Sequence, residues 1–261
     1  MRYRLFLFSL CTAWLMVLSA PAEETTDHAT ASVQRDPAGL FDQARLAYDE
    51  GRYAEAAARY TDLLESGYGG VEVLFNLGNA HFRNGRMGPA VLSYRRAWYL
   101  APRDEDIRTN LGFALDHTGA RYPAATPTAR VLRRATLAEW VSLATVGWWI
   151  AAILVALSAT MPHSRRLAVR LLGIVAVILV LSLAGAWQWL QLRASAEMVV
   201  VADDQVARYA PLEGSDTHFK LPAGSIVTRT EDAGEWLRVR MENRDGWVPK
   251  SACERVLGGG D

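Results

Sequence analysis

Two long stretches of the chain contain no charged residue. There are 23 such positions from 140 to 162, and 22 from 171 to 192. About 20 apolar residues are enough for a helix to cross the hydrocarbon core of a bilayer. Tryptophans, which favour the membrane interface, lie in or beside these stretches at Trp140, Trp148, Trp149, Trp187 and Trp189. The pattern predicts two adjacent transmembrane helices, at 138–161 and 169–191. A helical hairpin buried in a soluble protein is the alternative.

A third apolar stretch opens the chain. Arg2 and Arg4 precede an uncharged run over 5–20, and the small residues of Ala20-Pro21-Ala22 follow it. A basic start, an apolar middle and a small-residue end are the pattern of a cleaved signal peptide, here 1–22. An uncleaved anchor is the alternative. Cleavage would also remove Cys11 and leave Cys253 as the last cysteine, so the mature chain would fold without an intramolecular disulfide.

The expected topology follows from the signal peptide. A cleaved leader places 23–137 outside the cytoplasm, so the first span runs inward and the second returns 193–261 to the outside. The short loop over 163–170, HSRRLAVR, contains three arginines and fits the cytoplasmic side. Three further arginines over 130–134 oppose this orientation. We expect a multi-pass protein of the bacterial inner membrane with both soluble parts periplasmic.

Between the leader and the first span, small and aromatic residues recur every 34 positions. Gly51 matches Gly85, and Leu77-Gly78 matches Leu111-Gly112. Small residues at fixed intervals let helix backbones approach, and 34 residues is the length of a helix–turn–helix repeat. The segment resembles the tetratricopeptide repeat (TPR) family at Leu77, Gly78, Ala90, Tyr94, Ala97 and Pro102, with His81 in place of a usual Tyr. We expect an all-α solenoid over 37–118: two full repeats at 37–70 and 71–104, and one more helix at 105–118.

This resemblance implies a function for one face of the repeats. TPR stacks bind peptides or partner proteins on a concave face that is formed by the first helix of each repeat. Helical spacing places polar and aromatic candidates on that face: Arg45, Tyr48, Asn76, Asn79, Arg83 and Asn110. Asn and Arg side chains could hold a peptide backbone or a carboxylate. The alternative for each is a solvated residue on a helix surface.

After a linker over 119–136 and the two spans, apolar and polar residues begin to alternate along the chain. Short β-type runs fill 197–257 and are separated by turn signals. The motifs LPAG at 221–224, GEWLRVR at 234–240 and GWVP at 246–249 resemble bacterial SH3-like domains. This resemblance implies a small all-β barrel that binds peptides or cell-wall material. We expect Tyr209 and Trp236 to form an exposed ligand shelf, and Trp247 and Val248 to lie in the core.

Composition and motifs give no support for catalysis. Formal net charge is zero, and no basic run indicates nucleic acid. The five histidines are scattered without metal-ligand spacing. Neither a Gly-Lys-Ser/Thr phosphate loop nor a Gly-x-Ser-x-Gly elbow occurs. We therefore expect a protein that is not an enzyme and needs neither a cofactor nor a metal.

The order of segments resembles the BatE proteins of the bacterial Bat (aerotolerance) group. The phrases NLGNAHFRNG at 76–85 and LAPRDEDIRTNLGFA at 100–114 add to this resemblance. It implies a scaffold in an envelope or stress-tolerance complex, beside membrane proteins with von Willebrand A domains and a MoxR-type ATPase. The alternative is a peptidoglycan-binding module that recruits a cell-wall enzyme.

Overall fold

The computed structural model describes residues 36–120 and 126–257. The predicted signal peptide over 1–22 lies outside the described residues, as does part of the predicted linker. From Asp36 onward the described chain forms one compact unit. Its elements follow the expected order of helices, two long apolar helices and strands.

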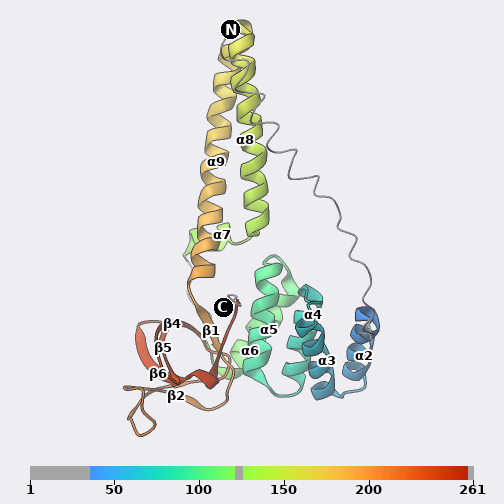
Figure 1. Cartoon of the computed structure of the whole chain (residues 1–261), viewed down its shortest axis with the longest axis vertical. Coiled ribbons are helices and arrows are strands. Elements are labelled where there is room, and N and C mark those ends of the chain that lie inside the picture. Colours follow the sequence, from blue (N-terminus) through green and yellow to red (C-terminus); the bar gives the residue numbers. More distant parts are fainter. Residues whose placement is uncertain (1–35, 121–125, 258–261) are drawn as a thin grey trace, which may run out of the picture. The chain divides into compact units, whose positions relative to one another are not determined.

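The first part of this unit is a set of paired helices (Figure 1). They are α2 (Pro37–Asp49), α3 (Tyr53–Glu65), α4 (Val71–Arg83), α5 (Met87–Leu100) and α6 (Glu105–Thr118). Capping explains two of the starts. The Asp36 side chain accepts a hydrogen bond from the Ala38 amide, and that of Asp104 accepts from Asp106 and Ile107. Gly51 and Gly85 adopt positive φ in the turns that close each pair, as their spacing suggests. The predicted helical, TPR-like region is confirmed.

The recurring glycines mark where helices approach. A methyl group at Gly78 on α4 would lie 2.5 Å from the Tyr94 ring of α5, so only glycine leaves room for this tyrosine. Gly112 is the equivalent position 34 residues later, on α6, and a methyl group there would meet no described atom beyond its own helix backbone within 4 Å. The difference arises because, among the described residues, α6 is not followed by a second helix equivalent to α5.

Two long apolar helices follow a short one. The short helix is α7 (Pro127–Leu132); the long ones are α8 (Leu137–Thr160) and α9 (Arg165–Ala194), joined through the turn η2 (Pro162–Ser164). α8 and α9 run side by side and pack on each other (Figure 1). Both are long and apolar enough to cross a membrane, which by itself is weak evidence that they do so.

The burial of side chains distinguishes a transmembrane hairpin from a hairpin in the core of a soluble protein. Only 6% of the most apolar window of α8 is buried, and 17% of that of α9. Large side chains such as Trp148, Ile153 and Val177 are exposed. A hairpin in the core of a soluble protein would have these side chains covered, so the burial disfavours that alternative.

The C-terminal part is one antiparallel β-sheet of seven strands. The strands are β1 (Glu197–Val200), β2 (Gln205–Arg208), β3 (Thr217–Leu221), β4 (Ile226–Ala233), β5 (Trp236–Met241), β6 (Arg244–Pro249) and β7 (Cys253–Arg255), with the turn η3 (Lys250–Ala252) before β7. Their order is β3-β2-β6-β5-β4-β1-β7. The predicted all-β region is confirmed as an antiparallel sheet, whereas its closure into a barrel is not established.

Alternation along β6 divides two residues that we expected together in the core. Val248 is fully buried, but Trp247 is only half-buried. Adjacent residues of a strand point to opposite faces, so both cannot enter the same core. Trp247 instead lies in register between Arg208 on β2 and Arg238 on β5.

The repeats and the sheet share one hydrophobic core. Most residues of α5 are buried, and the core cluster that they form extends to α9 and β1. A methyl group at Gly88 would lie 2.7 Å from backbone atoms of Val200 and Val201, so α5 rests directly on the β1 backbone and the residue that follows it. One at Gly224 would lie 2.8 Å from the Val91 side chain. The second helix of the second repeat is therefore covered by the sheet.

A buried ion pair lies at this junction. Arg95 on α5 is 1% exposed and Glu197 on β1 is 10% exposed. Arg95 donates from Nε to Oε1 at 2.6 Å and from Nη2 to Oε2 at 3.0 Å, a bidentate pairing. The Arg95 guanidinium also lies 4.2 Å from the Trp98 ring and 4.9 Å from the Tyr99 ring. Loss of one partner of a buried ion pair costs about 3–5 kcal/mol, because it leaves the other charge buried without its counter-charge.

The two equivalent glycines give a matched test of the repeat packing. We expect Gly78→Ala to destabilise the protein by about 1–3 kcal/mol, because the new methyl group overlaps the Tyr94 ring. Gly112→Ala should stabilise it by about 0.5–1 kcal/mol, since the site is open and alanine favours a helix. Thermal unfolding of both variants checks this. Equal effects of the two substitutions would contradict the packing described here.

Candidate protein-binding site

The predicted concave-face residues fall on α2, α4 and α6, but they do not all face solvent. The Asn79 Oδ1 atom accepts hydrogen bonds from the Tyr94 hydroxyl at 2.7 Å and from Asn110 Nδ2 at 3.0 Å. All three side chains are buried or half-buried. Asn79 and Asn110 therefore join α4, α5 and α6, and this bonding is a structural role that the sequence alone did not reveal.

Arg83 and Tyr48 meet at a tyrosine that sequence reasoning missed. Arg83 Nη2 donates to the Tyr53 hydroxyl at 2.7 Å, and its guanidinium lies 5.0 Å from the Tyr53 ring centre. Tyr48 packs edge-on against Tyr53, with centroids 5.3 Å apart. Burial raises the pKa of Tyr48 above its ordinary value, and Arg83 partly opposes this increase. The exposed Arg83 is thus held in a fixed position.

The remaining predicted residues differ in exposure. Asn76 is half-buried on α4. Arg45 is exposed and lies 3.8 Å from Asp42 and 3.9 Å from Asp49 on its own helix. At such distances and exposures, ion pairs contribute little to stability. Arg45 therefore remains able to meet a partner.

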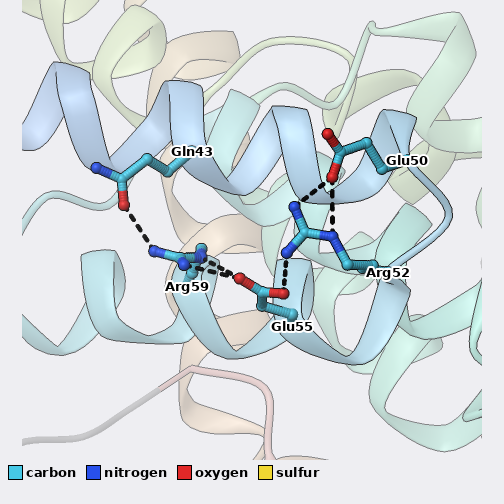
Figure 2. A network of polar contacts seen from close by, with 5 residues as sticks. All are labelled: Gln43, Glu50, Arg52, Glu55 and Arg59. Atoms are coloured by element: carbon cyan, nitrogen blue, oxygen red, sulfur yellow. Dashed lines mark hydrogen bonds and ion pairs between the residues drawn. The ribbon is translucent and has the colours of Figure 1, made fainter.

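Charges elsewhere in the first repeat are engaged with one another. Figure 2 shows Arg52 between Glu50 and Glu55, and Arg59 between Glu55 and Gln43. Arg52 Nε donates to Glu50 at 2.9 Å, and Arg59 Nη1 donates to Gln43 at 2.7 Å. The pKa of Glu55 is lowered by its hydrogen bonds from Arg59 and Arg52. This network connects α2 with α3 and satisfies its own charges.

An aromatic cluster lies on the face formed by the first helix of each repeat, α2, α4 and α6, which we call the first-helix face. Phe82 on α4 packs against Phe113 on α6 at 5.5 Å and against His117 at 6.1 Å. Phe113 is nonetheless 62% exposed. The exposed Phe113 on α6 and the fixed Arg83 on α4 give this face an apolar anchor and a cation, the features of a protein-binding surface. His117 was missed by sequence reasoning.

The predicted shelf on the sheet has one exposed member. Tyr209 is 63% exposed and stacks on His218, with ring centroids 4.3 Å apart. Trp236 is half-buried and pairs in register with Pro249. Tyr209 follows β2 and Trp236 begins β5, and β6 lies between these strands. His218, which sequence reasoning missed, rather than Trp236, is the ring that supports Tyr209.

Among the described residues, no cluster of three His, Cys, Asp or Glu side chains could hold a metal ion. The free cysteine, Cys253, is buried, and burial raises the pKa of its thiol to about 12. A thiol that stays protonated is a poor nucleophile.

Comparison with known proteins supports the repeats. The family described as Tetratricopeptide repeat matches residues 41–105. No curated protein matches the chain. TPR domains bind other proteins and are generally not enzymes, so protein–protein interaction is the function that this match supports.

His81 gives the repeats a pH-dependent stability. Its Nδ1 atom is buried and has no hydrogen-bond partner in the part of the chain that the structure describes, and burial, assisted by Arg86, lowers its pKa to about 4. Above pH 6.5 the histidine is neutral in both the folded and unfolded states. Between pH 6.5 and 4 only the unfolded state binds the proton, so the free energy of unfolding falls as the pH falls.

Because of this histidine, we expect the free energy of unfolding to be about 2 kcal/mol lower at pH 5 than at pH 7. A His81→Phe variant should lack that part of the pH dependence, because phenylalanine cannot bind a proton. His117→Gln, at an exposed position, is the control and should keep it. Urea unfolding at both pH values checks this. An unchanged pH dependence in His81→Phe would refute the assignment.

Proposed function

We propose that the protein is a non-enzymatic, membrane-anchored scaffold that binds partner proteins on the first-helix face of its repeats. The observation that carries this proposal is the unequal covering of the two faces. α5 is buried against β1 and the end of α9, whereas the face with Phe113 and Arg83 is open. A partner that binds the repeats would therefore meet α2, α4 and α6.

The proposal includes a place in the cell. α8 and α9 would cross the inner membrane as a hairpin, with the repeats and the sheet in the periplasm. The leader-like N-terminus and the three arginines at 165–170 support this orientation. The core that the repeats share with the sheet also supports a place for both on one side of the membrane, as a hairpin allows.

A reporter that is active only outside the cytoplasm, fused to the C-terminus, tests this orientation. We expect activity, because the second span returns the chain to the periplasm. A cytoplasmic reporter at the same point is the matched control and should be silent. Activity of the cytoplasmic reporter alone would reverse the proposed topology.

The segment order extends the proposal to particular partners. Its likeness to BatE proteins supports a Bat-type envelope or stress-tolerance complex with von Willebrand A-domain membrane proteins and a MoxR-type ATPase. In this complex the sheet would act as an SH3-like module beside the repeats. The second candidate, peptidoglycan binding, is favoured by Tyr209, because an exposed aromatic ring can stack on a sugar.

Co-purification from gently solubilised membranes tests the binding face. We expect the variant that combines Arg83→Glu with Phe113→Ala to co-purify at least about ten-fold less of the specific partner proteins. The variant reverses the charge of the fixed cation and removes the apolar anchor. Asn79 is unsuitable for this test, since it bonds to both Tyr94 and Asn110.

The control places the same types of change on the sheet, at two exposed residues. Arg244→Glu combined with Leu212→Ala should retain the partners. Retention by the repeat variant together with loss by the sheet variant would overturn the proposed site. Binding of wild type to purified cell-wall sacculi, with no protein partner recovered, would favour the second candidate.

A further inference from the structure

The segment that contains the two apolar helices has an unbalanced charge. Residues 127–194 include seven arginines and one carboxylate, that of Glu139. The arginines are Arg130, Arg133, Arg134, Arg165, Arg166, Arg170 and Arg193. The loop arginines 165–170 fit the cytoplasmic side of the proposed topology. The three at 130–134 do not, so they require another explanation.

The single carboxylate is already engaged elsewhere. The Glu139 side chain accepts a hydrogen bond from the Thr136 amide at 2.7 Å, within a capping box. Arg103, in the turn after α5, donates to it at 2.9 Å. Glu139 thus has its partners in Thr136 and Arg103, without the arginines at 130–134.

Those three arginines have no acidic partner within the described ranges 36–120 and 126–257. Arg130 and Arg134 are exposed, and Arg133 is half-buried. The Arg133 Nε atom is buried and has no hydrogen-bond acceptor among the described residues. A buried donor without an acceptor is costly, and a cluster of three cations repels itself. The cluster therefore has charge and hydrogen-bonding capacity to offer an anion.

Two tryptophans place this cluster at the end of the helical hairpin. Trp140 on α8 donates from Nε1 to the Leu132 carbonyl at 3.0 Å. Trp189 on α9 donates from Nε1 to the Ala135 carbonyl at 2.7 Å. The segment 130–135 is thus tied to the start of α8 and to the last turns of α9. In a bilayer this is the level of the lipid headgroups.

We infer that Arg130, Arg133 and Arg134 form a binding site for the phosphate of an anionic phospholipid in the leaflet on the repeat side. Guanidinium groups bind phosphate oxygens through paired, charge-assisted hydrogen bonds. Arg130 lies in α7, Arg133 caps its C-terminus and Arg134 follows in the turn, so the three cations fall within five consecutive residues at the end of this helix. This inference rests on the proposed insertion of α8 and α9 in a membrane.

The test uses the full-length protein and its own tryptophans. After reconstitution in phosphatidylcholine vesicles, brominated phosphatidylcholine or brominated phosphatidylglycerol is added and the quenching of tryptophan fluorescence is compared. Trp148 and Trp149 are exposed on α8, so quenching by the neutral lipid reports insertion. The ratio of the quenching by the anionic lipid to the quenching by the neutral lipid reports selectivity. We expect the anionic lipid to associate at least about five-fold more tightly, and less so at high salt.

Matched variants locate the selectivity. Replacing Arg130, Arg133 and Arg134 together by Gln should reduce the ratio to about one. The same replacement of Arg165, Arg166 and Arg170, at the other end of the hairpin, should preserve most of it. An equal loss in both variants would overturn the site, because it would show general attraction to an anionic surface.

Two further outcomes separate the remaining explanations. Soluble glycerophosphate should not compete with the brominated anionic lipid; efficient competition would mean that the site binds a soluble phosphate and would overturn the lipid assignment. Quenching by neutral lipid without any preference would overturn the site but leave membrane insertion intact. Absence of quenching by both lipids would overturn insertion, and with it the membrane part of the proposed function.

Discussion

The buried pairing of Arg95 with Glu197 is the contact on which the arrangement of the soluble parts depends. A charge that is removed from water must find its counter-charge and its hydrogen bonds in the protein, and the Arg95 guanidinium finds both in the Glu197 carboxylate. Trp98 and Tyr99 flank the guanidinium, and Trp98 also stacks on Trp189 of α9. One polar contact thus joins the repeats, the end of the apolar hairpin and the first strand.

This junction changes what the repeats can do. Separate modules on flexible connections could each bind a partner on any side. In this protein the sheet covers α5, and Arg96 adds hydrogen bonds to the carbonyls of Arg255 and Val256. The face of α2, α4 and α6 remains for a partner. A partner held there would be fixed in orientation relative to α9, and hence to the membrane in the proposed topology, which is a useful property for a scaffold.

The sequence predicted elements well where the signal is local. A 34-residue recurrence of small residues requires closely packed helix pairs, and uncharged runs of more than 20 residues require long apolar helices. Alternation after Arg193 predicted strands, because side chains in a sheet alternate between two faces. It could not decide barrel closure, and it placed both Trp247 and Val248 in one core although they are adjacent on β6.

The sequence by itself therefore determined the order and type of the elements, the packing role of Gly78 and the lack of a recognisable catalytic motif. The tertiary structure decided which polar residues are available to bind a partner. Asn79 and Asn110 matched a binding face by spacing, but they bond to each other and to Tyr94. Nothing near Arg95 in the sequence indicates its partner, because Glu197 lies 102 residues away. Helical periodicity assigns a residue to a face of its own helix, whereas long-range packing determines whether that face meets solvent or another part of the chain.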